Sequence, residues 1–261
     1  MRPRLLDLFC GEGGASVGYH RAGFDVFGVD LGGKKKDGTP TLGPLRHYPF
    51  DFHRGDALAF LAEHGHEFDA IHASPPCQGY SIATAGNPEA RAKHKRLIAA
   101  TRELLIVSDR PWVIENVEQA IAQMRRPITL CGRMFRLGAI DEDGEPLVLD
   151  RHRLFESNVP LTYPSHPSHE RDSRSVGGVY GGSRRAKNDG IERTLAEWAP
   201  LDRYAAKHVR KGGYVPRSRA VQQTLLGIDW MTVKGMQESI PPIYAEFVGA
   251  QLLEQIGRVA A

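Results

Sequence analysis

The stretch that decides the fold is LLDLFCGEGGASVGYHRAGFDVFGVD, residues 5–30. A short apolar run, 5–9, leads into a glycine-rich turn at 10–14, and the small residues that follow predict a helix ending near Gly23. A second apolar run ends in Asp30. Glycines let the backbone approach a ligand, and a helix start offers unpaired amides. The stretch therefore predicts strand, glycine turn, helix and strand, with a ligand site at the turn.

Asp30 supports a nucleoside site at this turn. It lies about 20 residues beyond the turn, where nucleoside-binding sheets place a carboxylate for the ribose hydroxyls. The glycines of 11–14 do not have the GxGxxG spacing, which argues against a dinucleotide.

Strands and helices alternate through the next hundred residues. Strands are predicted near 52–56, 68–73 and 111–117, and helices over 57–64 and 97–107. This order predicts an α/β fold with a mostly parallel sheet, helices on both faces, and ligands at the carboxyl ends of the strands. Asp56 ends one strand at that edge, although it is equally suited to cap the following helix.

The stretch from Ala73 to Ser81 carries the chemistry. Pro75 and Pro76 should end a buried strand, which puts Cys77 at the sheet rim. A buried structural cysteine is the alternative. Glu115 ends the strand at 111–117, where a carboxylate suggests a site but is found for structural reasons about as often.

Residues 147–155 alternate like a strand with Arg151 and Arg153 on one face. These arginines indicate either a salt-bridge ladder or anchors for a base or phosphate. An amphipathic helix is predicted over 243–256.

Charge is unevenly distributed. Residues 151–220 hold 14 Lys and Arg against 7 Asp and Glu, a balance of +7, whereas the rest of the chain has a balance of −4. A basic, loop-rich segment suggests a polyanion partner, although a solvated polar insert would look the same. We expect a first segment of alternating strands and helices at 1–155, a basic, loop-rich insert at 156–224, and a returning segment at 225–261. The basic segment 82–96 after Cys77 suits a mobile loop closing over an anionic substrate.

Several classes of protein are not indicated. The sequence contains no run of 18 apolar residues, so no membrane span is predicted. The first residues lack the apolar region of a signal peptide. The three cysteines are widely spaced, with no CxxC pair or Cys/His cluster to suggest zinc. We therefore expect a cytoplasmic protein that binds no metal.

Four motifs resemble those of the cytosine-C5 DNA methyltransferases, especially the short phage-type members. The motifs are 7–14 (DLFCGEGG), Pro76-Cys77-Gln78 with Ser81, Glu115-Asn116-Val117, and Arg151-His152-Arg153. The resemblance covers nearly all of the chain outside 156–224. It implies that 1–155 is the catalytic and cofactor-binding domain, that 156–224 is the target-recognition insert, and that 225–261 completes the catalytic domain. It also implies a monomer in a bacterium or a phage-infected cell. It implies a Rossmann-like fold that transfers a methyl group from S-adenosylmethionine, leaving S-adenosylhomocysteine, to cytosine C5 of double-stranded DNA.

The resemblance also implies roles for individual residues. Cys77 would add to cytosine C6, and Glu115, if kept protonated by burial, would donate to N3. Arg153, with Arg151, would hold the base or a flanking phosphate, and the target base would be flipped out of the duplex. The implied catalytic residues are Cys77, Glu115, Arg153, Arg151, Gln78 and Ser81. The implied cofactor residues are Phe9, Gly11, Gly13, Gly14, Asp30, Leu31, Asp56, Ala57, Pro76 and Gly249. The expected DNA contacts are Arg184, Arg185, Arg91 and Lys93.

Two positions depart from the family pattern. Leu149 replaces the glutamine of QxRxR, and Ala250 replaces the asparagine that follows the glycine of the last motif. Two alternatives stay open. The first is a transfer-RNA cytosine-C5 methyltransferase, because a relative of this family methylates transfer RNA with the same motifs. The second, suggested by the two departures, is an inactive protein that only binds DNA or cofactor. Intact Cys77, Gln78 and Glu115 argue against the second.

Overall fold

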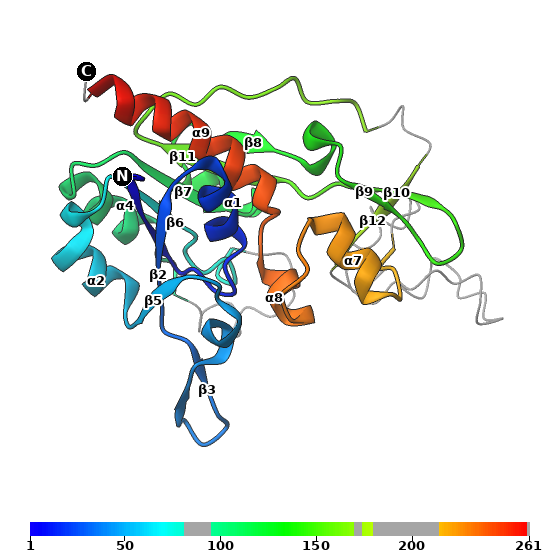
Figure 1. Ribbon diagram of the computed structural model, residues 1–261, viewed down its shortest axis with the longest axis horizontal. Helices are drawn as coiled ribbons and strands as arrows, with labels where there is room; N and C mark the ends of the chain where they lie inside the picture. The colour runs from blue at the N-terminus through cyan, green and yellow to red at the C-terminus, as the bar shows by residue number, and fades with distance from the viewer. Residues whose placement is uncertain (81–94, 170–173, 180–213, 260–261) are drawn as a thin grey trace. The chain divides into compact units, whose positions relative to one another are not determined.

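The computed structural model describes residues 1–80, 95–169, 174–179 and 214–259 (Figure 1). The chain divides into two compact units. The first comprises Met1–Thr129, Arg153–Tyr163 and Trp230–Ala261, and the second comprises Leu130–His152 and Pro164–Asp229. Each unit is described by itself.

The first unit is built on a seven-stranded sheet in the order β5-β2-β1-β6-β7-β11-β8. Strands β5, β2, β1, β6 and β7 run parallel, and β11 pairs antiparallel with β7, so the predicted α/β fold is confirmed. The strands of this sheet are β1 (Arg4–Leu8), β2 (Asp25–Asp30), β5 (Asp51–Arg54), β6 (Ala70–Ala73), β7 (Trp112–Asn116), β8 (Ile128–Leu130) and β11 (Arg153–Ser157). The helices of the unit are α1 (Gly14–Ala22), α2 (Ala57–His64), α4 (Ile98–Val107), α8 (Val233–Glu238) and α9 (Pro242–Val259). Its short 3-10 helices are η1 (Gly43–His47), η2 (Gly65–Glu67) and η4 (Glu118–Gln123).

The strand order reverses between β1 and β6. From β1 the chain adds β2 and β5 on one side, then returns to place β6 and β7 on the other. Open α/β sheets bind ligands in the crevice at such a reversal, beyond the carboxyl ends of the strands. The segments that leave β1 and β6 at this point are the glycine turn and the stretch that carries Cys77.

Helices pack on both faces of the sheet, because successive strand residues point to opposite faces. Leu6 and Leu8 of β1 join one buried cluster with residues of α2 and α4. Asp7, between them, accepts a hydrogen bond from Ser16 of α1 on the other face. The apolar run of β1 is therefore buried on both sides, as is usual for a central parallel strand.

Helices α1 and α9 lie side by side (Figure 1), although one is near the start of the chain and the other near its end. A Cβ atom at Gly18 would lie 2.1 Å from the Pro242 carbonyl oxygen and 2.7 Å from Ala245 Cβ. A Cβ at Gly249 would lie 2.9 Å from both Ala22 Cβ and Tyr19 Cδ1. Glycine on each helix lets the two backbones come this close.

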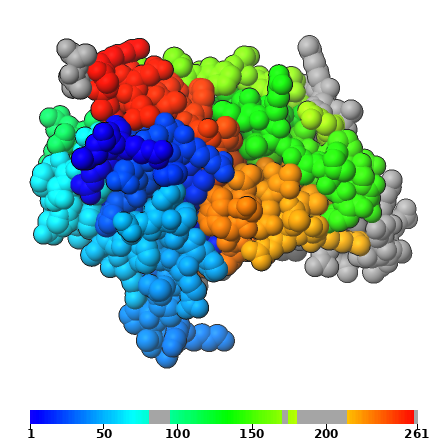
Figure 2. Space-filling model, viewed as in Figure 1, coloured from blue at the N-terminus to red at the C-terminus, as the bar shows by residue number. Residues whose placement is uncertain are grey.

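A small hairpin, β3 (Gly33–Lys34) and β4 (Pro40–Thr41), stands out from the surface of the first unit (Figure 2). It lies between β2 and β5 in the chain. None of the described helices is long and apolar enough to cross a membrane.

The described part of the second unit contains a three-stranded sheet in the order β12-β10-β9. Its elements are η5 (Gly132–Phe135), β9 (Gly138–Ile140), β10 (Pro146–Leu149), β12 (Ser175–Gly177) and α7 (Arg219–Leu226). Gly177 packs against α7, because a Cβ there would lie 2.7 Å from Leu225 Cδ1.

The prediction of a single strand over 147–155 is wrong. The chain forms β10 up to Leu149 and starts β11 at Arg153, because β10 pairs with β9 and β12 while β11 pairs with β7. Arg151 and Arg153 therefore do not share a strand face. For the same reason the compact units do not coincide with the predicted segment 156–224. The second unit also takes in Leu130–His152, and β11 keeps Arg153–Tyr163 with the first.

Candidate active site

Cys77 lies in a tight turn directly beyond β6. The Ser74 amide donates to the Leu8 carbonyl at 3.1 Å, which continues the pairing of β6 with β1 for one more residue. The prolines then end the strand, and the Tyr80 amide donates to the Cys77 carbonyl at 2.9 Å. The Cys77 side chain is partly exposed, so a substrate could reach its thiol.

Glu115 stands at the end of the neighbouring strand. Strand β7 pairs in parallel with β6, with Ala73 opposite Ile114, so the residues beyond both strands meet at one edge. Glu115 is 6% exposed, and its Oε2 accepts a hydrogen bond of 2.9 Å from Ser74 Oγ. A carboxylate that was ambiguous in the sequence is thus placed beside the loop that carries Cys77.

A chain of buried hydrogen bonds leads to Glu115 from helix α1. Tyr19 Oη lies 2.9 Å from His72 Nδ1, and His72 Nε2 lies 2.9 Å from Ser74 Oγ. Burial lowers the pKa of His72 to about 3, so the ring is neutral and carries one N–H. Ser74 donates to Glu115, so His72 donates from Nε2 to Ser74 and accepts at Nδ1 from Tyr19. The last group in this series of hydrogen bonds, the Ser74 hydroxyl, therefore donates to Glu115.

Arg153 approaches Glu115 from the other side. Arg153 Nε lies 3.2 Å from Glu115 Oε1, and the arginine is 8% exposed. Its position follows from β11, which runs antiparallel to β7 and so begins at the edge where β7 ends. Strand β11 is held by a buried ion pair in which Arg102 Nη2 of α4 lies 2.7 Å from Glu156 Oε2. Arg151 is also buried but belongs to the second unit.

Asn116 fixes the loop before Cys77. Its Nδ2 donates to the Pro75 carbonyl at 2.9 Å, and its Oδ1 accepts from the Val117 amide at 3.0 Å. The asparagine of the Glu-Asn-Val motif therefore has a positioning role that the residue order alone did not reveal. Ser74, His72 and Tyr19 were also missed, because nothing in the sequence pairs His72 with a tyrosine so far from it.

The glycine turn and Asp30 form a second cluster at the same edge. Asp30 accepts from the Gly11 amide at 3.2 Å and from the Gly32 amide at 2.8 Å, and burial raises its pKa above the usual range. Phe9 and Gly11 have φ angles of 61° and 55°, and a Cβ atom at Gly11 would meet nothing within 4 Å. There is open space over Gly11, as close backbone approach of a ligand requires.

The other predicted cofactor residues have varied surroundings. Asp56 caps α2, with Oδ1 accepting from the Leu58 and Ala59 amides at 2.9 and 3.1 Å. Leu31 is 61% exposed. Of the remaining cofactor positions, Gly13, Gly14, Ala57 and Gly249 are buried and Pro76 is partly exposed. Gln78, one of the predicted catalytic residues, is also partly exposed. A Cβ at Gly14 would lie 2.8 Å from the Ile240 carbonyl oxygen, so this glycine also serves packing.

Glu12, inside the glycine turn, ties the turn to the end of the chain. Its carboxylate accepts from the Thr232 amide and the Thr232 hydroxyl, each at 2.6 Å, and its carbonyl accepts from Trp230 Nε1 at 2.7 Å. Gly235 leaves room for this carboxylate, since a Cβ there would lie 2.3 Å from it. In the sequence, the only sign that Glu12 has this role was the presence of an acidic residue among the glycines.

Five predicted site residues lie outside the described residues. They are Ser81, Arg91, Lys93, Arg184 and Arg185. Their roles stay predictions.

Comparisons with known proteins bear on this site. Residues 3–130 match the family model described as C-5 cytosine-specific DNA methylase. No curated protein matches the chain in sequence. The structure resembles Dnmt2 methyltransferase of S. pombe, with a TM-score of 0.51, 15% identity, and coverage of 98% of this chain and 99% of that one.

Two further solved structures are similar at lower scores. A candidate DNA modification methyltransferase encoded within a prophage of E. coli has a TM-score of 0.49, 17% identity, and coverage of 98% and 99%. The methyltransferase EhMeth of Entamoeba histolytica has a TM-score of 0.47, 13% identity, and coverage of 100% and 99%. The matched family segment contains the glycine turn, Cys77 and Glu115, so the family predicted from the motifs is confirmed.

Proposed function

Because residues 3–130 place the chain in the C-5 cytosine-specific DNA methylase family, we propose that it methylates cytosine C5 in double-stranded DNA through a covalent Cys77 adduct. One observation carries the proposal. The loop with Cys77 follows β6, and Glu115 and Arg153 lie at the adjacent ends of β7 and β11, all at one edge of the sheet. Asp30 and the glycine turn lie at the same edge.

Asp30 and the glycine turn fit the cofactor. A half-buried carboxylate at the end of β2 suits ribose hydroxyls, and the open space at Gly11 suits the approach of a nucleoside. S-adenosylmethionine, when bound, supplies an electrophilic methyl group. Phe9, Gly11, Asp30 and Asp56 would hold it. Asp56 Oδ1 takes both capping bonds, which leaves Oδ2 to meet the adenine.

Cys77 performs the covalent step. Cytosine C5 is a poor nucleophile until a group adds to C6, and a thiolate adds readily and reversibly. The sulfur bonds to C6 while N3 gains a proton, which makes C5 electron-rich. After C5 is methylated, a base removes the C5 proton, the C6–S bond breaks to release the Cys77 thiolate, and N3 gives up the proton it had gained, which restores the ring. The partial exposure of Cys77 suits a base that has left the duplex.

Glu115 and Arg153 stabilise the charge that develops on the base when Cys77 adds to it. The two oxygens of Glu115 face Ser74 Oγ and Arg153 Nε, a pattern of donors that suits a carboxylate. Donation to N3 therefore requires Glu115 to take up a proton when the base arrives. We propose that Arg153 then turns from Glu115 to the base carbonyl or a flanking phosphate, which favours the protonated acid.

Methyl transfer should be measured with duplex DNA, single-stranded DNA and transfer RNA, using labelled S-adenosylmethionine. We expect 5-methylcytosine in duplex DNA. Label found only in transfer RNA would contradict the DNA substrate and favour the RNA alternative. Cofactor binding without transfer to any nucleic acid would favour the inactive alternative. Sequencing of methylated cytosines in DNA from expressing cells would then give the recognition site.

Replacing Asp30 by alanine should weaken S-adenosylmethionine binding by about 1–3 kcal/mol, which is the usual cost of leaving a polar partner without its hydrogen bond. Each 1.4 kcal/mol corresponds to about tenfold in affinity. Calorimetry would measure the change, with thermal unfolding as a check on the bonds to Gly11 and Gly32. Asp37→Ala, in the exposed β3–β4 hairpin, is the matched control. Unchanged affinity in Asp30→Ala would reject the assignment.

A further inference from the structure

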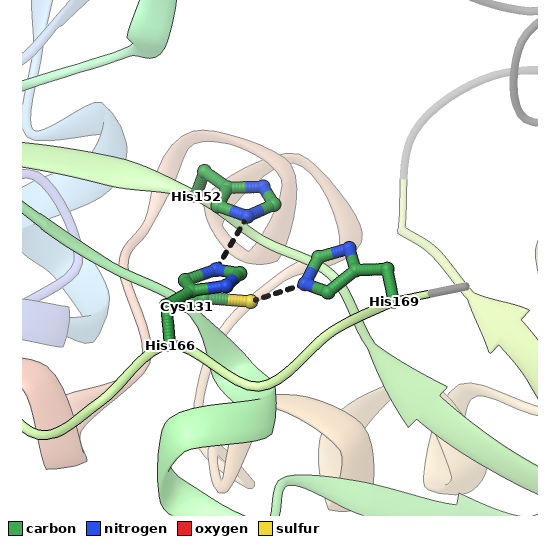
Figure 3. A group of neighbouring side chains, drawn as sticks. All are labelled: Cys131, His152, His166 and His169. Atoms are coloured by element: carbon green, nitrogen blue, oxygen red, sulfur yellow. Dashed lines mark hydrogen bonds between the residues drawn. The ribbon is translucent and has the colours of Figure 1, made fainter. Parts of the chain in front are cut away.

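The second unit contains a group of side chains that methyl transfer does not use. Cys131, His152, His166 and His169, here called the Cys131 cluster, converge on one point (Figure 3). Their ligand atoms all lie within 4.8 Å of one another. All four residues belong to this unit. The sequence shows no Cys/His cluster because three separate segments supply these residues.

The spacing of the atoms matches a tetrahedral metal site. Cys131 Sγ lies 3.5 Å from His169 Nε2, and His152 Nε2 lies 3.0 Å from His166 Nε2. Four ligands around zinc, at about 2.3 Å for sulfur and about 2.0–2.1 Å for nitrogen, would be separated by roughly 3.3–3.6 Å. Small shifts of the side chains would therefore bring all four into contact with one ion.

The surroundings of His169 support the same conclusion. Its Nδ1 lies 3.1 Å from Asp150 Oδ2, and Asp150 is held in turn by the Arg133 guanidinium. A histidine that binds a metal through one nitrogen usually donates its other N–H to a carboxylate, which fixes the ring and the tautomer. With Nδ1–H directed at Asp150, the lone pair of Nε2 is directed at the Cys131 sulfur, where the ion would lie.

We propose that the Cys131 cluster binds one zinc ion with a structural role. One thiolate and three imidazoles form a donor set that zinc prefers, and four protein ligands close a tetrahedral site. Partial or full exposure of His152, His166 and His169 leaves a path for the ion. This proposal does not depend on the proposed methyl transfer.

The zinc would stabilise the described part of the second unit. Its described sheet has three short strands, and small domains often depend on a metal for stability. Cys131 is the N-cap of η5, and His152 follows β10. His166 and His169 lie in a segment without helix or strand. The ion would thus join the turn before β9, the end of β10 and the segment leading to β12.

The first test is the metal content of the full-length protein, purified without chelators and measured by mass spectrometry for all first-row transition metals. We expect about one zinc per chain. Cys131→Ser and His169→Ala should lose it, and His66→Ala, an exposed histidine of the first unit, should keep it. Asp150→Asn should weaken zinc binding by about 10–100-fold. Zinc retained at full stoichiometry in both ligand variants, or copper or nickel in its place, would overturn the proposal.

A second test uses the wild-type chain and so does not depend on whether the variants fold. Protein stripped with a chelator should rebind one Co²⁺, with the visible bands of tetrahedral cobalt and a thiolate charge-transfer band. X-ray absorption of the zinc form should show one sulfur near ~2.3 Å and three nitrogens near ~2.0–2.1 Å. Hydrogen exchange should rise on stripping in 130–152 and 164–169 but not in β1 and β2. No thiolate band, or equal exchange in both states, would contradict the site.

Discussion

Replacing Cys77 by serine is expected to abolish methyl transfer while S-adenosylmethionine binding persists. A hydroxyl group is a far weaker nucleophile than a thiolate, and loss of a covalent nucleophile costs on the order of 10⁶-fold in kcat. Cys77 follows β6 in a turn that its own carbonyl closes, and serine fits this turn without strain. The loss should therefore appear in kcat, with the unfolding temperature unchanged.

Trapping of a covalent protein–DNA adduct distinguishes Cys77 from Cys10, the other cysteine of the first unit. Duplex DNA with 5-fluorocytosine should form a stable adduct with the wild type, because the fluorine blocks loss of the C5 substituent. Cys10→Ala should still form the adduct. Burial raises the pKa of the Cys10 thiol well above its usual value, and the Asp7 and Asp30 carboxylates add to the rise. Normal turnover by Cys77→Ser, or an adduct on Cys10, would refute the mechanism.

Replacing Glu115 by glutamine should lower kcat by about 10²–10⁴-fold, the usual contribution of a positioned acid. The amide has nearly the same shape, so β7 and its neighbours should keep their packing. It cannot pass a proton to cytosine N3, and it no longer forms an ion pair with Arg153. Single-turnover methylation with saturating cofactor and DNA would isolate this step from binding.

Glu118→Gln is the matched control for this experiment. Glu118 is an exposed carboxylate three positions further along the chain, in η4. Its substitution should leave kcat within about twofold, since exposed changes away from a site have small effects. If Glu115→Gln turned over like Glu118→Gln, proton donation by Glu115 would be excluded and the Glu115–Arg153 pair would be structural.

Local patterns in the sequence predict the catalytic unit well. The apolar runs of β1, β2, β6 and β7 are buried between two layers of helices. Each can therefore be recognised as a strand from its own sequence, without knowing which strands it pairs with. The glycine turn, Pro75 and Pro76 mark where strands end. Because parallel strands end at a common edge, these signals are enough to bring Cys77, Glu115 and Asp30 together there.

The features that prediction missed depend on contacts between distant residues. The run 147–155 alternates like one strand, but its two ends pair with different sheets, and alternation does not reveal the partner. Tyr19 reaches Glu115 only through His72 and Ser74, which the sheet brings together. The Cys131 cluster was missed because zinc is usually recognised from closely spaced ligands, and here Cys131 is far from the histidines in sequence.

The contact between α1 and α9 constrains how the chain can fold during synthesis. The face of α1 that carries Gly18 is completed by residues from Pro242 onward, and 219 residues lie between Ala22 and Pro242. At about 5–20 residues per second, a ribosome needs roughly 10–45 s to make them. During that time the apolar side of α1 has no partner helix, and long-range pairing of this kind is slow to form. Helix α1 is therefore translated long before its native packing can be completed, and in that interval the nascent chain is a natural client for chaperones.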